Sequence, residues 1–167
     1  MIRRCTSLDF GTIYEILNDA SQAYKGIIPD DRWHEPYMSR DQLAHEIEAT
    51  VVFWGIELDG QLACVMGIHD KGEVVLIRHA YVRTKVRNQG IGTELLQYLE
   101  NTTDKPILIG TWADASWAVC FYRKNGYRLE TEQEKNHLLR KFWSIPERQI
   151  ETSVVLANTK WKPDNLK

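Results

Sequence analysis

The chain has 167 residues, of which 43% are hydrophobic and 26% charged, proportions that are ordinary for a soluble domain able to bury its own core. Its formal net charge of −2 disfavours a surface built for nucleic acid, because such domains are usually strongly basic. No apolar run reaches the length of a membrane span. We therefore expect neither a nucleic-acid partner nor a membrane segment.

The three cysteines, Cys5, Cys64 and Cys120, are an odd number and contain no Cys-x-x-Cys spacing. The scattered histidines form no metal-binding pattern. Basic residues at the N-terminus are not followed by the apolar core of a signal peptide. These features predict a reduced, cytoplasmic protein without a metal site.

Apolar residues recur at helical spacing behind Asp9, which stands where an N-cap would, and they predict a first helix. The segment 26–39 contains two prolines and a pair of aspartates, which is typical of a long loop. A second helix is expected to follow this loop and to pass through Leu43 and Ile47. Long loops of this kind often carry functional residues.

Two β-rich runs, 51–57 and 62–68, flank Asp59-Gly60, a preferred pair for a tight hairpin turn. The run 74–82 predicts a third strand of the same antiparallel meander. A helix through Leu95, Leu96 and Leu99 and a short buried strand at 107–110 follow it. This βαβ crossover predicts that strand 107–110 lies parallel to strand 74–82.

Further elements are predicted toward the C-terminus from turn chemistry and periodicity. The sheet is therefore mixed, and helices flank it. We expect one domain over residues 1–157 and a tail at 158–167 that is loosely held from Lys160. The remaining predicted elements are a helix at 116–124, a strand at 127–130, a helix at 132–142 and a final strand at 148–157.

A glycine pair, Gly90 and Gly92, stands where the helix after strand 74–82 begins. The free N–H groups and positive dipole end of a helix start attract phosphate, and glycine lets a diphosphate approach the backbone closely. A P-loop and a dinucleotide fingerprint are both excluded, because the first lacks Gly-Lys-Ser/Thr and the second meets Leu95 at its third small position. The alternative is a glycine-rich turn that only joins strand to helix.

The run Arg87-Asn88-Gln89-Gly90-Ile91-Gly92 resembles the Gln/Arg-x-x-Gly-x-Gly/Ala signature of the GNAT superfamily of acyl-CoA-dependent N-acyltransferases. The later run 118–127 is similar to that family's Ala-x-x-Phe-Tyr-x-x-x-Gly-Phe helix. Both stand in the family's order, and the resemblance extends from about Ile2 to Ala157. It implies a sheet of about seven strands with a splayed parallel pair, formed here by 74–82 and 107–110, and acetyl-CoA as cosubstrate.

The resemblance also implies site residues. Backbone groups near Ala80 to Val82 would bind the pantetheine arm and the acetyl carbonyl, the amides from Asn88 to Thr93 would hold the pyrophosphate, and Tyr122 would protonate the departing thiolate. The alternative for Tyr122 is a core aromatic residue. The residues assigned to the cosubstrate are Ala80, Tyr81, Val82, Arg87, Asn88, Gln89, Gly90, Ile91, Gly92 and Thr93.

One departure from the family is Ala115, which stands where many relatives have asparagine. In relatives this asparagine makes a hydrogen bond to the pantetheine arm. Here that hydrogen bond is either missing or supplied by Asp114 or Ser116. Trp112 and Trp117 nearby indicate a bulkier wall than usual.

The acceptor side is less defined. Strand alternation predicts that Arg78 faces the cleft and that His79 points away, which makes His79 a poor candidate for the general base. Arg78 is a candidate partner for a substrate carboxylate or else a rim residue with a local acidic partner. In the loop, Asp31 and Trp33 combine a carboxylate with an aromatic ring, which suits a cationic amine, although a solvated acidic turn has the same composition.

The sequence thus predicts an N-acetyltransferase that moves an acetyl group from acetyl-CoA to a primary amine, a small molecule or a peptide, by direct attack in a ternary complex. One alternative is a catalytically weak CoA-binding sensor or regulatory module. Another is a nucleic-acid-binding domain that uses Arg83, Lys85 and Arg87, which the acidic balance disfavours. A homodimer is compatible with the sequence.

Overall fold

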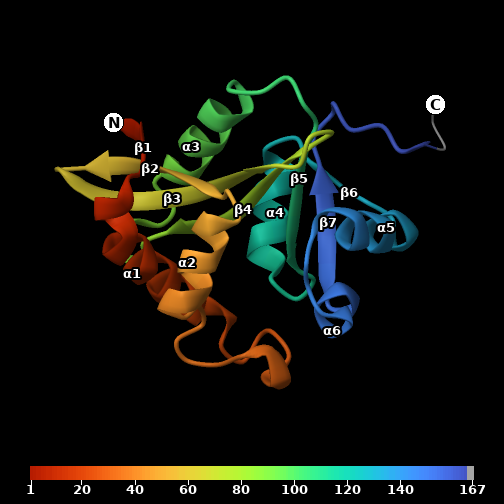
Figure 1. Cartoon of the computed structure of the whole chain (residues 1–167), viewed down its shortest axis with the longest axis horizontal. Helices are drawn as coiled ribbons and strands as arrows, with labels where there is room; N and C mark the ends of the chain where they lie inside the picture. Colours follow the sequence, from red (N-terminus) through yellow and green to blue (C-terminus); the bar gives the residue numbers. More distant parts are fainter. Residues whose placement is uncertain (165–167) are drawn as a thin grey trace.

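One seven-stranded sheet organises residues 1–164, the part of the chain that this computed structural model describes (Figure 1). The strand order is β1-β2-β3-β4-β5-β7-β6, and every neighbouring pair is antiparallel except β4 and β5. This mixed sheet confirms the predicted fold class. The strands are β1 (Ile2–Arg4), β2 (Val52–Leu58), β3 (Gln61–Asp70), β4 (Val75–Val82), β5 (Ile107–Trp112), β6 (Arg128–Leu129) and β7 (Ser153–Ala157).

Helices cover both faces of this sheet (Figure 1). Helices α3 and α4 pack on one face, while α1, α2, α5 and α6 pack on the other. Short 3₁₀ turns lie in several of the connections between these elements. The helices are α1 (Phe10–Ala20), α2 (Arg40–Glu48), α3 (Ile91–Glu100), α4 (Ser116–Lys124), α5 (Glu132–Phe142) and α6 (Glu147–Glu151), and the 3₁₀ turns are η1 (Ser7–Asp9), η2 (Ser21–Tyr24), η3 (Asp30–Arg32) and η4 (Thr84–Val86).

Local sequence signals explain where several elements begin. Ser39 accepts a hydrogen bond from Gln42 N at 3.1 Å, and the Gln42 side chain accepts one from Ser39 N at 2.8 Å, so a capping box starts α2. Asp59 and Gly60 have φ values of 51° and 75°, the left-handed pair that a tight hairpin between β2 and β3 requires. The predicted helices at 116–124 and 132–142 are confirmed as α4 and α5.

The predicted final strand at 148–157 is wrong in its first half. Pro146 stands at the N-cap of α6, and its carbonyl accepts a hydrogen bond from Gln149 N at 2.9 Å. Proline is readily accommodated at a helix start, where no N–H donor is needed. Strand β7 therefore begins only at Ser153.

The described part of the tail, residues 158–164, is held against the domain rather than loose. The Lys160 ammonium donates to Thr103 O at 2.9 Å, and Arg128 donates to Trp161 O at 2.8 Å. The Trp161 side chain packs against the buried cluster between α5 and β7. Residues 165–167 of the predicted tail lie outside the described residues.

Strands β4 and β5 are paired in parallel only at their beginnings, which confirms the predicted crossover. Their register runs from Val75 and Ile107 to Ile77 and Ile109, and no further pair joins them within the described residues. Strand β4 nevertheless continues to Val82, and β5 continues to Trp112 alongside β7. The two strands therefore diverge in the middle of the sheet.

A β-bulge interrupts β4 at this point of divergence. The register with β3 shifts between Val65 and Gly67, and His79 has a φ of 53°. Before the bulge, Ile77 packs on the α3 face, and after it Ala80 and Val82 do so. One residue is thus inserted into the alternation, which places His79 on the same side as Arg78.

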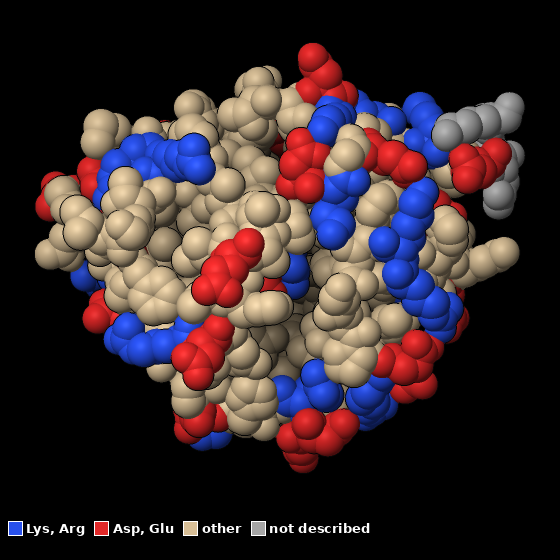
Figure 2. Space-filling model, in the orientation of Figure 1, with Lys and Arg blue, Asp and Glu red and all other residues tan. Residues whose placement is uncertain are grey.

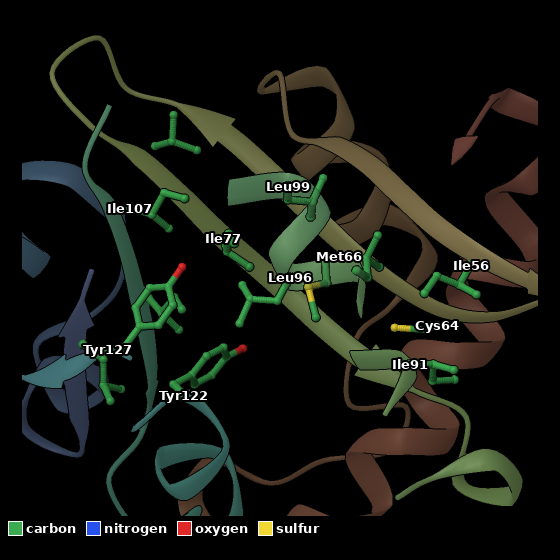
Figure 3. Close-up of a cluster of buried hydrophobic side chains, with 14 of the residues drawn as sticks. Ile56, Cys64, Met66, Ile77, Ile91, Leu96, Leu99, Ile107, Tyr122 and Tyr127 are labelled. Atoms are coloured by element: carbon green, nitrogen blue, oxygen red, sulfur yellow. The ribbon is translucent and has the colours of Figure 1, made fainter. Parts of the chain in front are cut away.

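The α3 face of the sheet holds a large apolar cluster (Figure 3). Leu96 and Leu99 from α3 pack there against Ile77 of β4 and Ile107 of β5. Tyr122 from α4 belongs to the same cluster, and Figure 3 shows its ring beside Leu96. The residues that follow Ile77 along β4 thus start from a rigid, close-packed base.

Candidate active site

The start of α3 forms an open, positively polarised edge of the molecule. Gly90 is the N-cap residue with a φ of 80°, a left-handed conformation that favours glycine. A Cβ atom on Gly90 would meet no atom within 4 Å, so the space beside this backbone is free. The N–H groups of the first helical turn have no partner within the helix. A diphosphate therefore fits this edge in both shape and charge.

Two of the three basic residues before α3 hold the loop in place. Arg83 donates from Nε to Leu62 O at 2.8 Å, and Arg87 donates from Nη2 to Ala20 O at 2.9 Å. Ala20 is the last residue of α1, where the helix dipole favours a cation. Thr84 N also donates to Asp19 Oδ2 at 2.7 Å. The Arg87 guanidinium is thus bonded to α1, although its backbone belongs to the loop that was assigned to the cosubstrate.

A cavity of about 590 Å³ lies on the opposite face, where β4 and β5 diverge. Its walls come from α2, from the loop before α2, from the diverging ends of β4 and β5, and from the segment after α5. Figure 2 shows a hollow at the middle of the drawn face, with side chains of both charges around it. The lining residues used below are Tyr24, Arg32, Tyr37, Asp41, Glu46, Arg78, His79, Tyr81, Trp112, Trp143 and Gln149.

A partly buried ion pair crosses this cavity wall from β4 to α2. Arg78 Nη1 lies 2.9 Å from Glu46 Oε2, and Nη2 donates to Glu46 Oε1 at 3.2 Å. His79 Nε2 lies 3.2 Å from the same Oε2 atom, although at an angle that makes no directed hydrogen bond. Arg78 therefore lines the cavity, but its charge is already matched by Glu46.

These contacts set the protonation of the pair. Burial raises the pKa of Glu46, but His79 and Arg78 lower it more, so the carboxyl stays below its usual value of 4.5. Burial lowers the pKa of His79 below 6.5, and Arg78 adds to that effect while Glu46 opposes it. His79 is consequently a neutral base at pH 7, held beside a carboxylate.

The orientation predicted for His79 is wrong, because the bulge in β4 breaks the strand alternation on which it rested. Glu46 was missed entirely, since an acidic residue on an amphipathic helix gives no signal that it faces a strand. Its place in the site follows only from the contact between Glu46 on α2 and Arg78 on β4.

An aromatic cluster forms the wall on the side of the 26–39 loop. The Tyr24 and Tyr37 rings are 5.2 Å apart, and Trp112 Nε1 donates to the Tyr37 hydroxyl at 2.7 Å. Trp117 stacks on Tyr24 with ring centres 5.9 Å apart but does not itself line the cavity, whereas Trp112 does. Ala115 is fully buried beneath this cluster.

Asp31 and Trp33 do not line the cavity. The exposed Asp31 carboxylate forms an ion pair with Arg148, with Nε and Oδ2 3.1 Å apart. Trp33 stacks on Tyr37 with ring centres 5.8 Å apart, so it supports the wall and does not form it. The tyrosines of this loop region, which the sequence did not single out, take the place expected for Trp33.

Tyr122 lies on the α3 face and not among the residues that line the cavity. Burial raises the pKa of its phenol, and Tyr24 and Cys64 raise it further. The hydroxyl is therefore protonated across the whole neutral range. Its neighbour Tyr127 packs edge-on with ring centres 6.0 Å apart.

Within residues 1–164 no group of three or more histidine, cysteine, aspartate or glutamate side chains is arranged to hold a metal ion. Nor does any helix in that part combine the length and apolar character needed to cross a membrane.

A divergent strand pair with an open glycine-led helix on one face and a cavity on the other is the arrangement expected of an acyl-CoA-dependent acyltransferase. The family model of the GNAT acetyltransferase domain matches residues 17–140. The chain therefore belongs to the GNAT acetyltransferase family, and the predicted use of acetyl-CoA is confirmed at this general level. A comparison with curated protein sequences finds no match.

Solved structures of low sequence identity share the fold. The PaiA N-acetyltransferase of Thermoplasma acidophilum, crystallised with coenzyme A, is 19% identical with a TM-score of 0.72, and the match covers 96% of this chain and 98% of that one. The Escherichia coli ribosomal-protein-S18-alanine N-acetyltransferase is 15% identical with a TM-score of 0.66, over 100% and 98%. N-acetylglutamate synthase of Neisseria gonorrhoeae is 18% identical with a TM-score of 0.65, over 97% and 35%.

The contacts around His79 give a first prediction. Glu46→Gln removes the negative charge that raises the pKa of His79, so that pKa falls below its wild-type value. The measurement is an NMR titration of the His79 ring. Glu48→Gln, an exposed change on the same helix, leaves the His79 titration unchanged. An unchanged or higher His79 pKa in Glu46→Gln contradicts the assigned contact.

Proposed function

We propose that the chain transfers the acetyl group of acetyl-CoA directly to a primary amine held in the cavity beside His79. The observation that carries the proposal is the divergence of β4 from β5 beyond Ile77 and Ile109. On one side of the diverging strands lies the open start of α3, and on the other side lies the cavity. A donor bound at α3 and an acceptor bound in the cavity can then meet between the strands.

The residues present fit acetyl-CoA as a substrate. The free space beside Gly90 accommodates a pyrophosphate against the unpaired N–H groups of α3. Beyond Ile77, the edge of β4 that faces β5 has no partner strand within the described residues, so backbone groups of Ala80 to Val82 on that edge are available to an extended pantetheine arm. Tyr81 and Val82 also pack into the neighbouring clusters, which fixes the edge in position.

The chemistry that this arrangement supports is direct aminolysis. The amine nitrogen attacks the thioester carbonyl, a C–N bond forms, the C–S bond breaks, and an N-acetyl amine and free CoA result. His79 accepts the proton that the amine loses, because it is neutral at pH 7 and lines the cavity. Glu46 stabilises the imidazolium that forms.

Tyr122 is proposed as the acid for the departing thiolate. Its raised pKa keeps the phenol protonated, so that a proton is present when the C–S bond breaks. Tyr122 belongs to the α3 face, where the donor is proposed to bind. In this proposal His79 accepts the proton of the amine on one face of the sheet, and Tyr122 protonates the thiolate on the other face.

The cosubstrate site is tested by thermal stability. Acetyl-CoA raises the Tm of the wild-type protein by binding the folded state, and Gly90→Glu abolishes this rise because it adds bulk and like charge to the cradle. Gly60→Glu is the matched control, because Gly60 also has a positive φ, of 75°, and open space. Both variants lose stability from strain, but Gly60→Glu retains the acetyl-CoA response. An equal rise in Tm with acetyl-CoA in both variants contradicts binding of the cosubstrate at α3.

The base is tested by the pH dependence of turnover. In the wild type, kcat/KM falls as the pH drops through the lowered pKa of His79, because the protonated ring accepts no proton. His79→Gln loses this acidic limb, and its kcat falls by about 10²-fold or more. The assay is release of free CoA with a panel of amines. His137→Gln, an exposed histidine on α5, keeps wild-type kinetics. The acceptor amine's own protonation adds the same pH dependence to both proteins, so the difference between their profiles reports His79. Identical profiles for the wild type and His79→Gln assign the base to another group.

The acid is tested by removing one hydroxyl. Tyr122→Phe keeps the ring in its cluster, so acetyl-CoA still raises the Tm while kcat falls by about 10²–10⁴-fold. Tyr127→Phe removes a neighbouring phenol of the same cluster and leaves kcat unchanged. Wild-type turnover in Tyr122→Phe contradicts the role of Tyr122 as the acid and assigns its ring to packing alone. Loss of the Tm response shows that its hydroxyl binds the cosubstrate instead.

A further inference from the structure

The charged side chains that line the cavity are only partly paired with one another. Asp41 and Glu46 reach it from α2, while Arg32 reaches it from η3 and Arg78 from β4. Two arginines and two carboxylates leave the lining without formal net charge. Arg78 and Glu46 neutralise each other at 2.9 Å, which leaves Asp41 on one wall and Arg32 on another.

Arg32 has no charged partner in the described chain. Its Nη2 atom lies 3.5 Å from Gln149 Oε1, a long and neutral contact. Its Nε atom is buried and has no hydrogen-bond partner. The adjacent carboxylate, Asp31, is bound to Arg148 at 3.1 Å. Buried donors without partners are rare and costly, and a guanidinium has five N–H groups to satisfy. Arg32 is therefore short of an anionic acceptor within the cavity.

We propose that the acceptor substrate is a small amino carboxylate, and that Arg32 binds its carboxylate group while its amine lies toward Glu46 and His79. This inference rests on the proposed function and adds the substrate class. A carboxylate matches the planar fork of a guanidinium with two parallel hydrogen bonds. Gln149 lies at the same end of the cavity and adds an amide donor there.

The remaining features of the cavity agree with this substrate class. A zwitterion brings no net charge into a lining that has none, whereas a phosphate dianion or a doubly protonated diamine brings two unmatched charges. Asp41 makes no ion pair within residues 1–164, so it attracts an approaching ammonium group. The volume of about 590 Å³ is within the range of small-molecule sites. Arg78, in contrast, positions Glu46 and does not bind the substrate carboxylate.

The test compares matched acceptors in the CoA-release assay. Glycine, β-alanine, 4-aminobutyrate and lysine are each paired with the corresponding carboxamide, and aminomethylphosphonate and 1,5-diaminopentane are added. In the wild type, at least one amino carboxylate has a kcat/KM about ten- to one-hundred-fold above that of its carboxamide, as expected for charge-assisted hydrogen bonds. A preference for the phosphonate, the diamine or the carboxamides overturns the inference.

Variants assign the preference to one side chain. Arg32→Gln removes the advantage of the carboxylate over the carboxamide, mainly through KM, and Arg32→Lys restores part of it. Arg140→Gln is the control, because Arg140 pairs with Glu147 outside the cavity; it leaves the preference intact. A preference that survives in Arg32→Gln contradicts the assignment of Arg32.

A binding measurement separates failure of this inference from failure of the proposed function. With CoA present, the amino carboxylates raise the Tm of the wild type more than their carboxamides do, and Arg32→Gln loses the difference. Equal shifts, or none, overturn the inference even where acetyl-CoA itself raises the Tm. Absence of any acetyl-CoA response and of any CoA release in the wild type overturns the proposed function as well.

Discussion

The end of hydrogen bonding between β4 and β5 at Ile77 and Ile109 is the constraint on which the rest of the site depends. Backbone groups seldom remain unpaired inside a protein, so the gap must be held open by neighbouring structure. The bulge at His79 turns β4 aside. On the other strand, Trp143 packs so closely on Gly110 that an added Cβ would lie 3.2 Å from its ring. The bulge on β4 and the packing of Trp143 on β5 therefore lie on the two sides of the gap.

The same divergence makes α2 part of the site. Glu46 can reach Arg78 and His79 only because the bulge presents two successive β4 side chains to the same face. The Glu46 carboxylate is partly buried between the Arg78 cation and the neutral His79 imidazole, so removing it leaves the Arg78 charge without its partner. The arrangement of charges in the cavity therefore depends on the path of β4.

The sequence predicted what depends on local signals. Helical periodicity, the Asp59-Gly60 turn and the crossover placed most elements, and the motif around Gly90 predicted the family. It failed where the pairing of distant segments decides the outcome, as at His79, where the register between β3 and β4 shifts. It also missed a local signal, because Pro146 starts the short helix α6 inside the predicted final strand. Arg32 and Glu46 have ordinary sequence surroundings, and only their places in the fold give them a role.

The anchoring of the loop before α3 has a thermodynamic consequence. Arg87 and Thr84 bind this loop to the end of α1, and the chain continues directly from there through η2 to Tyr24 at the cavity wall. A ligand that shifts or stiffens this segment from one side changes the free energy of binding on the other side, and linkage makes such an effect equal in both directions. For a donor and an acceptor bound as proposed above, this segment couples the two affinities, and the hydrogen bonds of Arg87 and Thr84 to the end of α1 contribute to that coupling.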